Sequence, residues 1–495
     1  MGQFRFLVPH GDRLSEASVQ RAYLGGADHV PWLTEASWEG PLLVVEREVR
    51  ESGVLALPWF VAGHGEVVLS TTSLMERKQP YDLTLELARG TLHRLRAQLA
   101  QWQLLGFQPA AESRSLVEAA QEAFLRAATH QSQPDCVLES AELCLQSALS
   151  AIDRICAEFA VVAIESRLTP NSQLTTLLGA PLESPPLDGK AAKWVQASFN
   201  TAQLPFCWAE QEQTPGVRSY GALENQLRWC RELGLKTIAG PLFRPNRRSW
   251  PTWLDARTAN FETLQRHVID YVQDTVRTFQ GKVHVWHAAA AVAGDNETRL
   301  TEEQRLRLVV NVVETVRQLD ARTPLIVSFD QPWGEYMTRR HYDLSPLHFA
   351  DMLVRSDLGI AGLGLEINFG YEQRATWPRD LLEVNRQIDH WSTLGLPLLV
   401  FLTAPSNSGT DPWAREPVAA NPRLGASGPS PEWQKRFAER FVPFLIAKQA
   451  VHSVIWNQLR DEFPHDFPHG GLFDRDGARK PAIEALADVR QRHLT

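Results

Sequence analysis

From residue 170 to the C-terminal residue 495, short apolar runs alternate with segments of helical spacing. The helical segments include 221–234, 263–279 and 301–319, and the third opens with Thr301 and Gln304 at the spacing of a capping box. The eight apolar runs lie at 175–182, 198–208, 236–243, 282–290, 324–330, 360–369, 397–405 and 452–461. Eight strands alternating with helices are typical of a (β/α)8 barrel, so we predict an α/β fold of the TIM-barrel type.

Two doubly wound α/β domains are the alternative interpretation of this alternation. Such domains bind nucleotides through a glycine-rich loop that joins a strand to a helix. The stretch "GLGLEI" at 362–367 has the first two glycines of that fingerprint but lacks the third, and it lies within an apolar run. The pattern therefore favours the barrel.

Residues 1–168 have a different pattern. Positions 40–77 are rich in Val, Leu and aromatic residues and contain turn candidates, which indicates several antiparallel strands. Apolar residues then recur every three or four positions over 92–102 and 141–163. We predict a smaller N-terminal domain, a small mixed β-sheet followed by helices, and a barrel domain at 170–495. The helical stripe is typical of a packed core, and a protein partner of this domain is the alternative.

Length and charge limit the classes of protein. A chain of 495 residues exceeds what one hydrophobic core usually contains, which again indicates two domains. A net charge of −8 without a basic run argues against a nucleic-acid partner. No apolar run is long enough to span a membrane, and the first residues, "MGQFRFLVPHGDR", do not resemble a signal peptide, so we expect a cytoplasmic protein without a membrane partner.

Candidate metal ligands are few. The five cysteines form no CxxC pair, which predicts reduced thiols and no structural zinc. His465 and His469 lie close together in "HDFPH", but no third ligand accompanies them. We therefore expect neither a metal nor a cofactor.

Polar and aromatic residues gather where the predicted strands end, which is where a (β/α)8 barrel carries its active site. Indole rings can cover the apolar faces of sugar rings, and carboxylates and amides can bind hydroxyl groups, so this mixture indicates a saccharide ligand. Each tryptophan is equally compatible with a filler between strands and helices. The predicted ligand-contacting residues are Trp208, Trp286, His287, Asn368, Tyr371, Trp456 and Asp461.

Carboxylates at the same strand ends are the candidates for catalysis. Glu366 is the first of them, because it lies near the end of the sixth apolar run. Its candidate partners are Glu210, Glu212, Asp330 and Asp461.

Five stretches resemble glycoside hydrolase family 10, whose best-known members are retaining endo-β-1,4-xylanases with a (β/α)8 barrel. The resemblance extends from about residue 175 to the C-terminus. It rests on "FNTAQLPFCWAEQEQTPG", on "RELGLKTIAGPLF" with the following "SWPTWL", on "IAGLGLEIN", on "VIWNQLRDEFP" and on "GGLFDRDGARKPAIEAL". It implies the barrel fold and an affinity for sugars.

The resemblance also identifies where the family's catalytic residues would fall. The fourth strand of the family reads Trp-Asp-Val-Val-Asn-Glu, which places Ala291 at the general acid/base. The seventh reads Thr-Glu-Leu-Asp, which places Leu402 at the nucleophile, and Gly240 stands at a substrate-binding His. Glu366 matches a Gln, so it is not the family nucleophile. Because retaining hydrolysis needs two carboxyl groups, the resemblance does not imply xylanase chemistry.

Three hypotheses follow from these residues. The protein is a glycoside hydrolase with relocated carboxylates, a saccharide-binding barrel without catalysis, or a scaffold whose N-terminal domain recruits partners.

Overall fold

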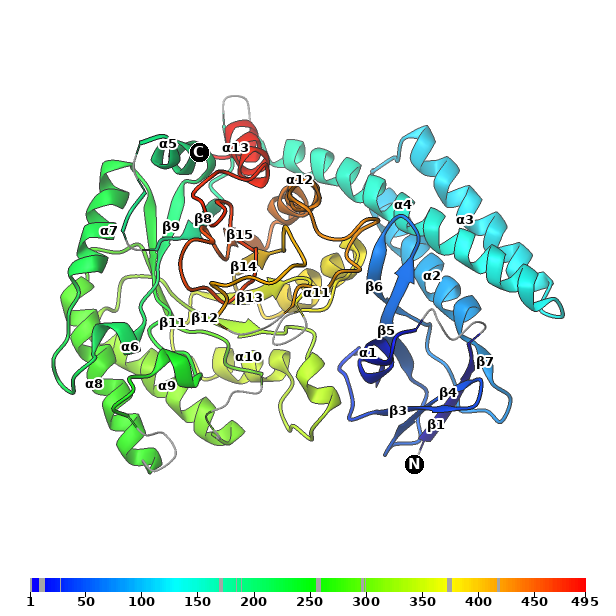
Figure 1. Cartoon of the computed structure of the whole chain (residues 1–495), viewed down its shortest axis with the longest axis horizontal. Coiled ribbons are helices and arrows are strands. Elements are labelled where there is room, and N and C mark those ends of the chain that lie inside the picture. Colours follow the sequence, from blue (N-terminus) through cyan, green and yellow to red (C-terminus); the bar gives the residue numbers. More distant parts are fainter. Residues whose placement is uncertain are drawn as a thin grey trace.

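The computed structural model describes most of the chain, and Figure 1 shows a barrel beside a smaller N-terminal part. The described residues are 2–8, 14–26, 28–168, 172–183, 185–187, 189–254, 260–294, 298, 300–371, 376–415 and 419–495. Within these ranges, no helix is both long enough and apolar enough to cross a membrane.

Eight parallel strands close into the barrel, in which each strand pairs with the next along the chain and β8 pairs with β15. They coincide with the eight apolar runs, so the predicted TIM barrel is confirmed. The strands are β8 (Leu177–Pro181), β9 (Thr201–Leu204), β10 (Lys236–Ala239), β11 (Val285–Ala289), β12 (Leu325–Asp330), β13 (Gly362–Asn368), β14 (Leu398–Thr403) and β15 (Val451–Trp456).

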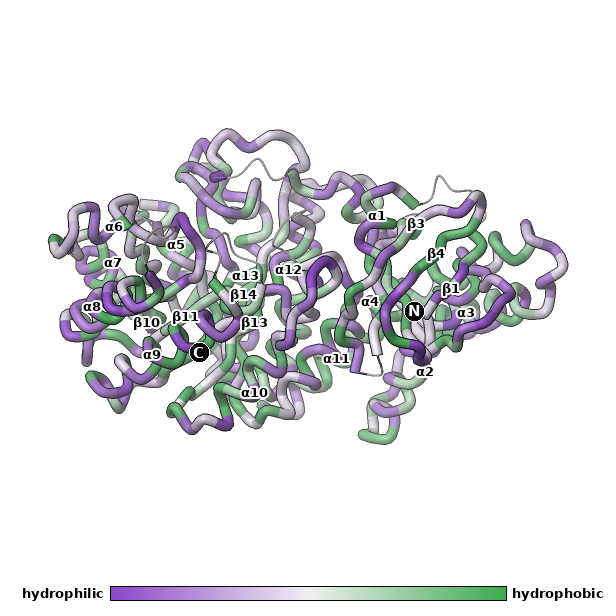
Figure 2. Tube along the Cα trace, turned by 90° about the horizontal axis from the view of Figure 1, so that it is seen from below, coloured by the Kyte–Doolittle hydropathy of each residue, from purple (hydrophilic) through white to green (hydrophobic). Residues whose placement is uncertain are grey.

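Helices surround the barrel and bury one face against it. In Figure 2, α8 and α9 carry both hydrophobic and hydrophilic segments, as amphipathic helices do. The predicted capping box is present, because Thr301 Oγ1 accepts from the backbone of Gln304 and the Gln304 side chain accepts from Thr301 N. The helices are α5 (Gly189–Ser198), α6 (Trp208–Gln211), α7 (Gly221–Glu232), α8 (Phe261–Phe279), α9 (Glu302–Leu319), α10 (Pro346–Arg355), α11 (Leu381–Ser392), α12 (Pro431–Ala447) and α13 (Ala482–His493).

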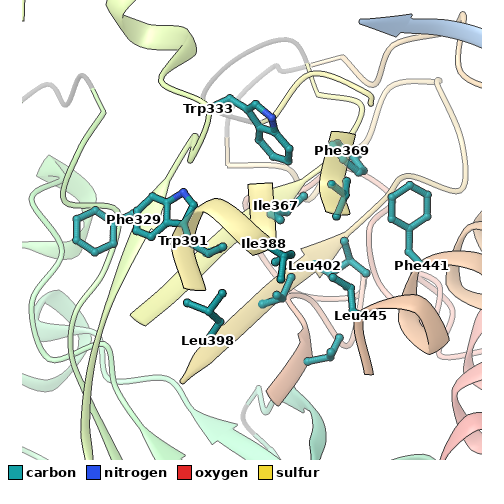
Figure 3. Packing of buried hydrophobic residues seen from close by; sticks show 14 of the residues in the cluster. Phe329, Trp333, Ile367, Phe369, Ile388, Trp391, Leu398, Leu402, Phe441 and Leu445 are labelled. Atoms are coloured by element: carbon teal, nitrogen blue, oxygen red, sulfur yellow. The ribbon is translucent and has the colours of Figure 1, made fainter. Parts of the chain in front are cut away.

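Side chains alternate between the barrel's interior and its helix-covered outside, as strand geometry requires. Ile238, Ile326, Phe401 and Ile455 come from four strands and form one cluster in the interior. Leu402, the neighbour of Phe401, belongs instead to the large core shared with the helices, and Figure 3 shows it facing α12.

The N-terminal part contains two small sheets and three long helices, α2 (Leu83–Leu104), α3 (Ala111–Thr129) and α4 (Pro134–Arg167). The predicted order of strands followed by helices is confirmed. The strands divide into two sheets because β1 pairs with β4 and β7, which leaves β5 and β6 to pair with β2. The first sheet has β1 (Gly2–Leu7), β3 (Glu35–Glu39), β4 (Leu42–Arg47) and β7 (Tyr81–Asp82); the second has β2 (Tyr23–Gly25), β5 (Val54–Val61) and β6 (Gly65–Ser70).

The N-terminal part and the barrel share a polar contact. Arg94 of α2 donates two hydrogen bonds to Asp380, the N-cap of α11, at 3.2 and 2.8 Å. Val68 N of β6 donates to Pro378 O at 2.7 Å. Helix α4 lies beside α12 (Figure 1). The predicted domain boundary between 168 and 170 adjoins residues 169–171, which lie outside the described residues, and it stays a prediction.

Candidate functional site

A series of buried polar side chains crosses the barrel near the C-terminal ends of its strands. Gln203 Nε2 lies 3.4 Å from His287 Nδ1, and His287 Nε2 lies 2.9 Å from Ser328 Oγ. Ser328 Oγ in turn donates to Glu366 Oε1 at 2.7 Å. Burial, and after it the charge of Arg244, lowers the pKa of His287 to about 3, so the ring is neutral. Because Ser328 donates to Glu366, His287 Nε2 is the donor to Ser328 and Nδ1 accepts from Gln203. The series is therefore directed toward Glu366.

Glu366 and Asp330 are a pair of carboxylates on neighbouring strands, in direct cross-strand register. Glu366 Oε1 accepts a hydrogen bond from Ala291 N at 3.1 Å. Asp330 Oδ1 accepts from Ala293 N and Gly294 N at 3.2 and 3.1 Å. Burial raises the pKa of Glu366 above its usual range. Both carboxylates thus bind the segment that follows β11.

Two positions that the resemblance singled out have unusual backbone conformations near these carboxylates. Ala291 has a φ of +51°, in the left-handed region that L-residues rarely adopt, and this conformation accompanies the bond from its N–H to Glu366. Gly240 has a φ of +130°, and a Cβ atom there would lie 2.1 Å from His287 O. A histidine at position 240 would therefore require the backbone of β11 to move.

A pocket of about 2420 Å³, including space open to solvent, lies just beyond the C-terminal ends of β8, β9, β10 and β15. The polar side chains of Gln203, Gln226 and Asn457 line it. The amide oxygens of both glutamines are buried and accept no hydrogen bond from any described residue. The aromatic lining residues are Phe206, Trp208, Phe243, Trp250, Phe463 and Phe467.

Charged side chains also line this pocket. The side chain of Arg244 is 23% exposed, and its Nη2 lies 3.8 Å from Glu366 Oε2. Arg415 lies 3.3 Å from Asp466 and 3.9 Å from Glu210. Burial alone would raise the pKa of Asp466, but Arg415 and Arg244 hold it below its usual value. Asp466 is therefore ionised.

Two of the predicted site residues, Trp208 and Glu210, line the pocket. Trp208 stacks on Tyr271 with 5.4 Å between ring centroids and donates Nε1 to Glu212 at 2.8 Å, so one face of its indole is covered. The side chain of Glu210 is 68% exposed. Glu366 is not among the lining residues and meets the pocket through Arg244, and Asp330 lies on the neighbouring strand beside it.

The structure places Trp286 and Trp456 on the outer face of the barrel. Trp286 Nε1 donates to Asp320 at 3.0 Å, at the end of α9, and Trp456 Nε1 donates to a backbone oxygen in the following loop at 2.9 Å. Both side chains fill space between strands and helices, which is the alternative that the sequence left open. The residues that follow them, His287 and Asn457, face inward, because side chains alternate along a strand.

Asn368 and Tyr371 support the pocket without lining it. Asn368 Oδ1 accepts from Asn457 Nδ2 at 3.2 Å. The buried ring of Tyr371 packs against Phe467, with 5.4 Å between ring centroids. Each therefore positions one lining residue.

Asp461 and the two histidines stabilise the loops around the pocket. Asp461 forms a buried ion pair with Lys480 of the C-terminal tail. His465 Nε2 and His469 N both contact Asp411 Oδ2, at 2.9 and 2.8 Å. The part of the chain that the structure describes contains no group of three or more side chains able to bind a metal ion.

Several lining residues were not among those predicted from the sequence: Arg244, Arg415, Phe463, Asp466 and Phe467. Arg244 directly follows the third apolar run, so its place at a strand end was a usable signal. The other four lie in loops after β14 and β15, where no periodicity indicates which side chains face inward.

Part of the chain is similar in sequence to a known xylanase, although no family model matches the chain. Endo-1,4-beta-xylanase B of Neocallimastix patriciarum is 23% identical over 197 residues, which is 37% of this chain and 21% of that protein. The chain therefore spans about a fifth of the length of this curated relative.

Solved structures of xylanases are also similar to part of the chain, with TM-scores below 0.5. Xylanase 10B from Thermotoga petrophila RKU-1, in complex with xylobiose, is 13% identical with a TM-score of 0.48, and the match covers 66% of this chain and 99% of that one. Xylanase B from Clostridium stercorarium F9 is 16% identical with a TM-score of 0.49, covering 63% and 97%. At these identities the likeness to the solved structures is one of fold alone.

Proposed function

We propose that the barrel binds a β-linked oligosaccharide in the pocket beyond β8, β9, β10 and β15. The observation that carries this proposal is the lining itself: the partly exposed amide of Asn457 and the partly exposed aromatic rings of Phe463 and Phe467. Sugar hydroxyls donate to amide oxygens, while the C–H faces of sugar rings pack on aromatic rings. The name of the similar curated protein, an endo-1,4-beta-xylanase, supports a β-1,4-linked ligand.

We also propose that the barrel does not hydrolyse the bound oligosaccharide by the retaining mechanism of glycoside hydrolase family 10. Retaining hydrolysis needs two carboxyl groups about 5–5.5 Å apart, one of which protonates the leaving oxygen. The described carboxylates that line the pocket are Glu183, Glu210 and Asp466, and each forms an ion pair with an arginine. Arg415 and Arg244 hold the pKa of Asp466 below its usual range, which does not suit it to donate a proton, whereas burial raises the pKa of Glu183 although both of its oxygens accept hydrogen bonds from Arg460.

The test is calorimetric titration with xylotetraose, cellotetraose and mannotetraose, together with an assay of reducing sugar released from the matching polysaccharides. We expect binding of at least one oligosaccharide and no release from xylan. Phe467→Ala should weaken that binding by roughly 1 kcal/mol, the scale of one aromatic contact. Phe124→Ala on α3, outside the pocket, is the matched control and should leave affinity unchanged. If no oligosaccharide binds, the proposal fails and the scaffold hypothesis takes its place.

A glycoside hydrolase with relocated carboxylates is the second candidate, and the pairing of Glu366 with Asp330 favours it. A buried carboxyl group with a raised pKa is suited to general acid catalysis. If a glycan is hydrolysed, Glu366→Gln should abolish turnover while leaving affinity intact, because the amide keeps the shape and loses the proton. Turnover that survives this change eliminates the second candidate.

The N-terminal part contributes no described residue to the lining of the pocket. A protein partner for it, and a cytoplasmic location, remain predictions from the sequence.

A further inference from the structure

The pocket contains one cation whose hydrogen-bonding capacity is unused. A guanidinium carries five N–H donors. Arg244 donates no hydrogen bond to any described residue, and its only ion pair, with Glu366, is 3.8 Å long, beyond hydrogen-bonding distance. Two arginines nearby differ: Arg218 donates to Glu212 at 2.8 Å, and Arg460 donates to Glu462 at 2.8 Å. The donors of Arg244 are therefore available to a ligand.

The surrounding carboxylates are already engaged elsewhere. Asp466 accepts a hydrogen bond from Arg415 at 3.3 Å, and Glu183 accepts from Arg460 at 3.3 Å. Glu366 accepts from Ser328 and Ala291 through Oε1, so the oxygen that faces Arg244 is the other one. An anionic group on a ligand would meet Arg244 without breaking an ionic hydrogen bond.

On the basis of the proposed saccharide function, we propose that Arg244 recognises a carboxylate on the sugar, so that the pocket prefers an oligosaccharide containing a uronic acid. The planar guanidinium matches a carboxylate through two parallel N–H···O bonds, whereas a sugar hydroxyl accepts one bond and carries no charge. Phe463 and Phe467 provide apolar surface on the same pocket, so a ring can pack there while its carboxylate meets Arg244.

The test compares two tetrasaccharides that differ only at C6: cellotetraose and its oxidised counterpart, tetra-β-1,4-glucuronate. Calorimetric titration of the full chain should give at least 10-fold tighter binding of the glucuronate. Arg244→Met should lower the affinity for the glucuronate at least 10-fold more than the affinity for cellotetraose, so that the preference disappears. Arg355→Met, an exposed arginine on α10, is the control for losing one positive charge and should keep the preference.

Arg244→Lys gives a second variant in case the methionine protein does not fold. It keeps the charge but loses the planar pair of donors, so most of the preference should disappear. Equal affinity of the wild-type protein for the two tetrasaccharides, or a preference that survives in Arg244→Met, would overturn the role of Arg244 while the saccharide function stands. Failure of every neutral and acidic oligosaccharide to bind would overturn the saccharide function itself.

Discussion

Arg244 and Glu366 connect the pocket to the buried polar series of the barrel: Nη2 of the arginine lies 3.8 Å from Oε2 of the glutamate. Arg244 lines the pocket, whereas Glu366 lies behind it and receives the hydrogen bond of Ser328. Burial raises the pKa of Glu366, and Arg244 opposes that rise. A ligand carboxylate paired with Arg244, as proposed, would weaken this opposition and would therefore couple ligand binding to the protonation of Glu366.

The raised pKa of Glu366 predicts the pH dependence of one substitution. An acid whose pKa is higher in the folded state than its unfolded value of about 4.5 binds more protons when folded. The free energy of unfolding therefore falls as the pH rises from about 4.5 to the folded pKa of Glu366. The fall is ~1.4 kcal/mol for each pH unit between these two values. Glu366→Gln removes this effect, so its stability relative to wild type should increase from pH 4 to pH 7. Chemical denaturation at intervals of one pH unit measures the difference.

Asp320→Asn is the control for that experiment, because its stability relative to wild type should change with pH in the opposite direction. Burial alone would raise the pKa of Asp320, but hydrogen bonds from Trp286 and Thr323 lower it below its usual value. The ionised form of Asp320 thus stabilises the fold, and the asparagine variant should lose stability at pH 7 and approach wild type only in acid. If Glu366→Gln behaves like Asp320→Asn, ionised Glu366 stabilises the barrel and our account of it is wrong.

The resemblance to glycoside hydrolase family 10 places Leu402 at the nucleophile position. A substitution of Leu402 tests whether its side chain faces the pocket or the helices. Its side chain is fully buried and faces Phe441 and Leu445 of α12 (Figure 3). A carboxylate there would lie in apolar surroundings without a partner, so Leu402→Glu should lower the free energy of unfolding by ~3 kcal/mol or more and restore no hydrolysis. Leu402→Met conserves volume and should cost less than ~1.5 kcal/mol. A stable Leu402→Glu protein that cleaves xylan would show that position 402 faces the pocket.

Trp456 distinguishes a packing role from a ligand-binding role. Its indole is 1% exposed and meets Phe437 of α12, so Trp456→Ala should cost ~3–5 kcal/mol of stability. The folded protein should keep its affinity for the oligosaccharide. Phe463→Ala, by contrast, changes a partly exposed lining residue and should weaken binding with little loss of stability. Calorimetric titration and thermal unfolding of both variants separate the two roles, and a loss of affinity in Trp456→Ala alone contradicts this assignment.

The fold could be predicted from the sequence because its determinants are local. Apolar runs and helical stripes identify strands and helices, and the capping box at Thr301 marks the start of α9 within one residue. The direction of a side chain at a strand end was harder to predict, since Trp286 and His287 are adjacent and only the tertiary pairing decides which of them faces inward. The pocket itself depends on loops after β14 and β15, which carry no periodic signal. Arg244 was missed because an arginine after a strand is ordinarily a solvated surface residue.

The barrel, residues 172–495, should fold without the N-terminal part, although the two parts are in contact. Arg94 pairs with Asp380 at the start of α11, and both side chains are largely buried only because the two parts meet. Arg94→Met in the full chain leaves Asp380 buried without its partner, so the full chain should lose ~3–5 kcal/mol. In the isolated barrel we expect Asp380 to be open to water and still to cap α11 through Glu383 N, as it does in the full chain, without that penalty. We therefore expect the fragment 172–495 to fold with the circular dichroism of an α/β barrel, and to be insensitive to Asp380→Asn, because asparagine also caps the start of a helix. A fragment that remains unfolded while the full chain is stable would make the N-terminal helices part of the barrel's own core.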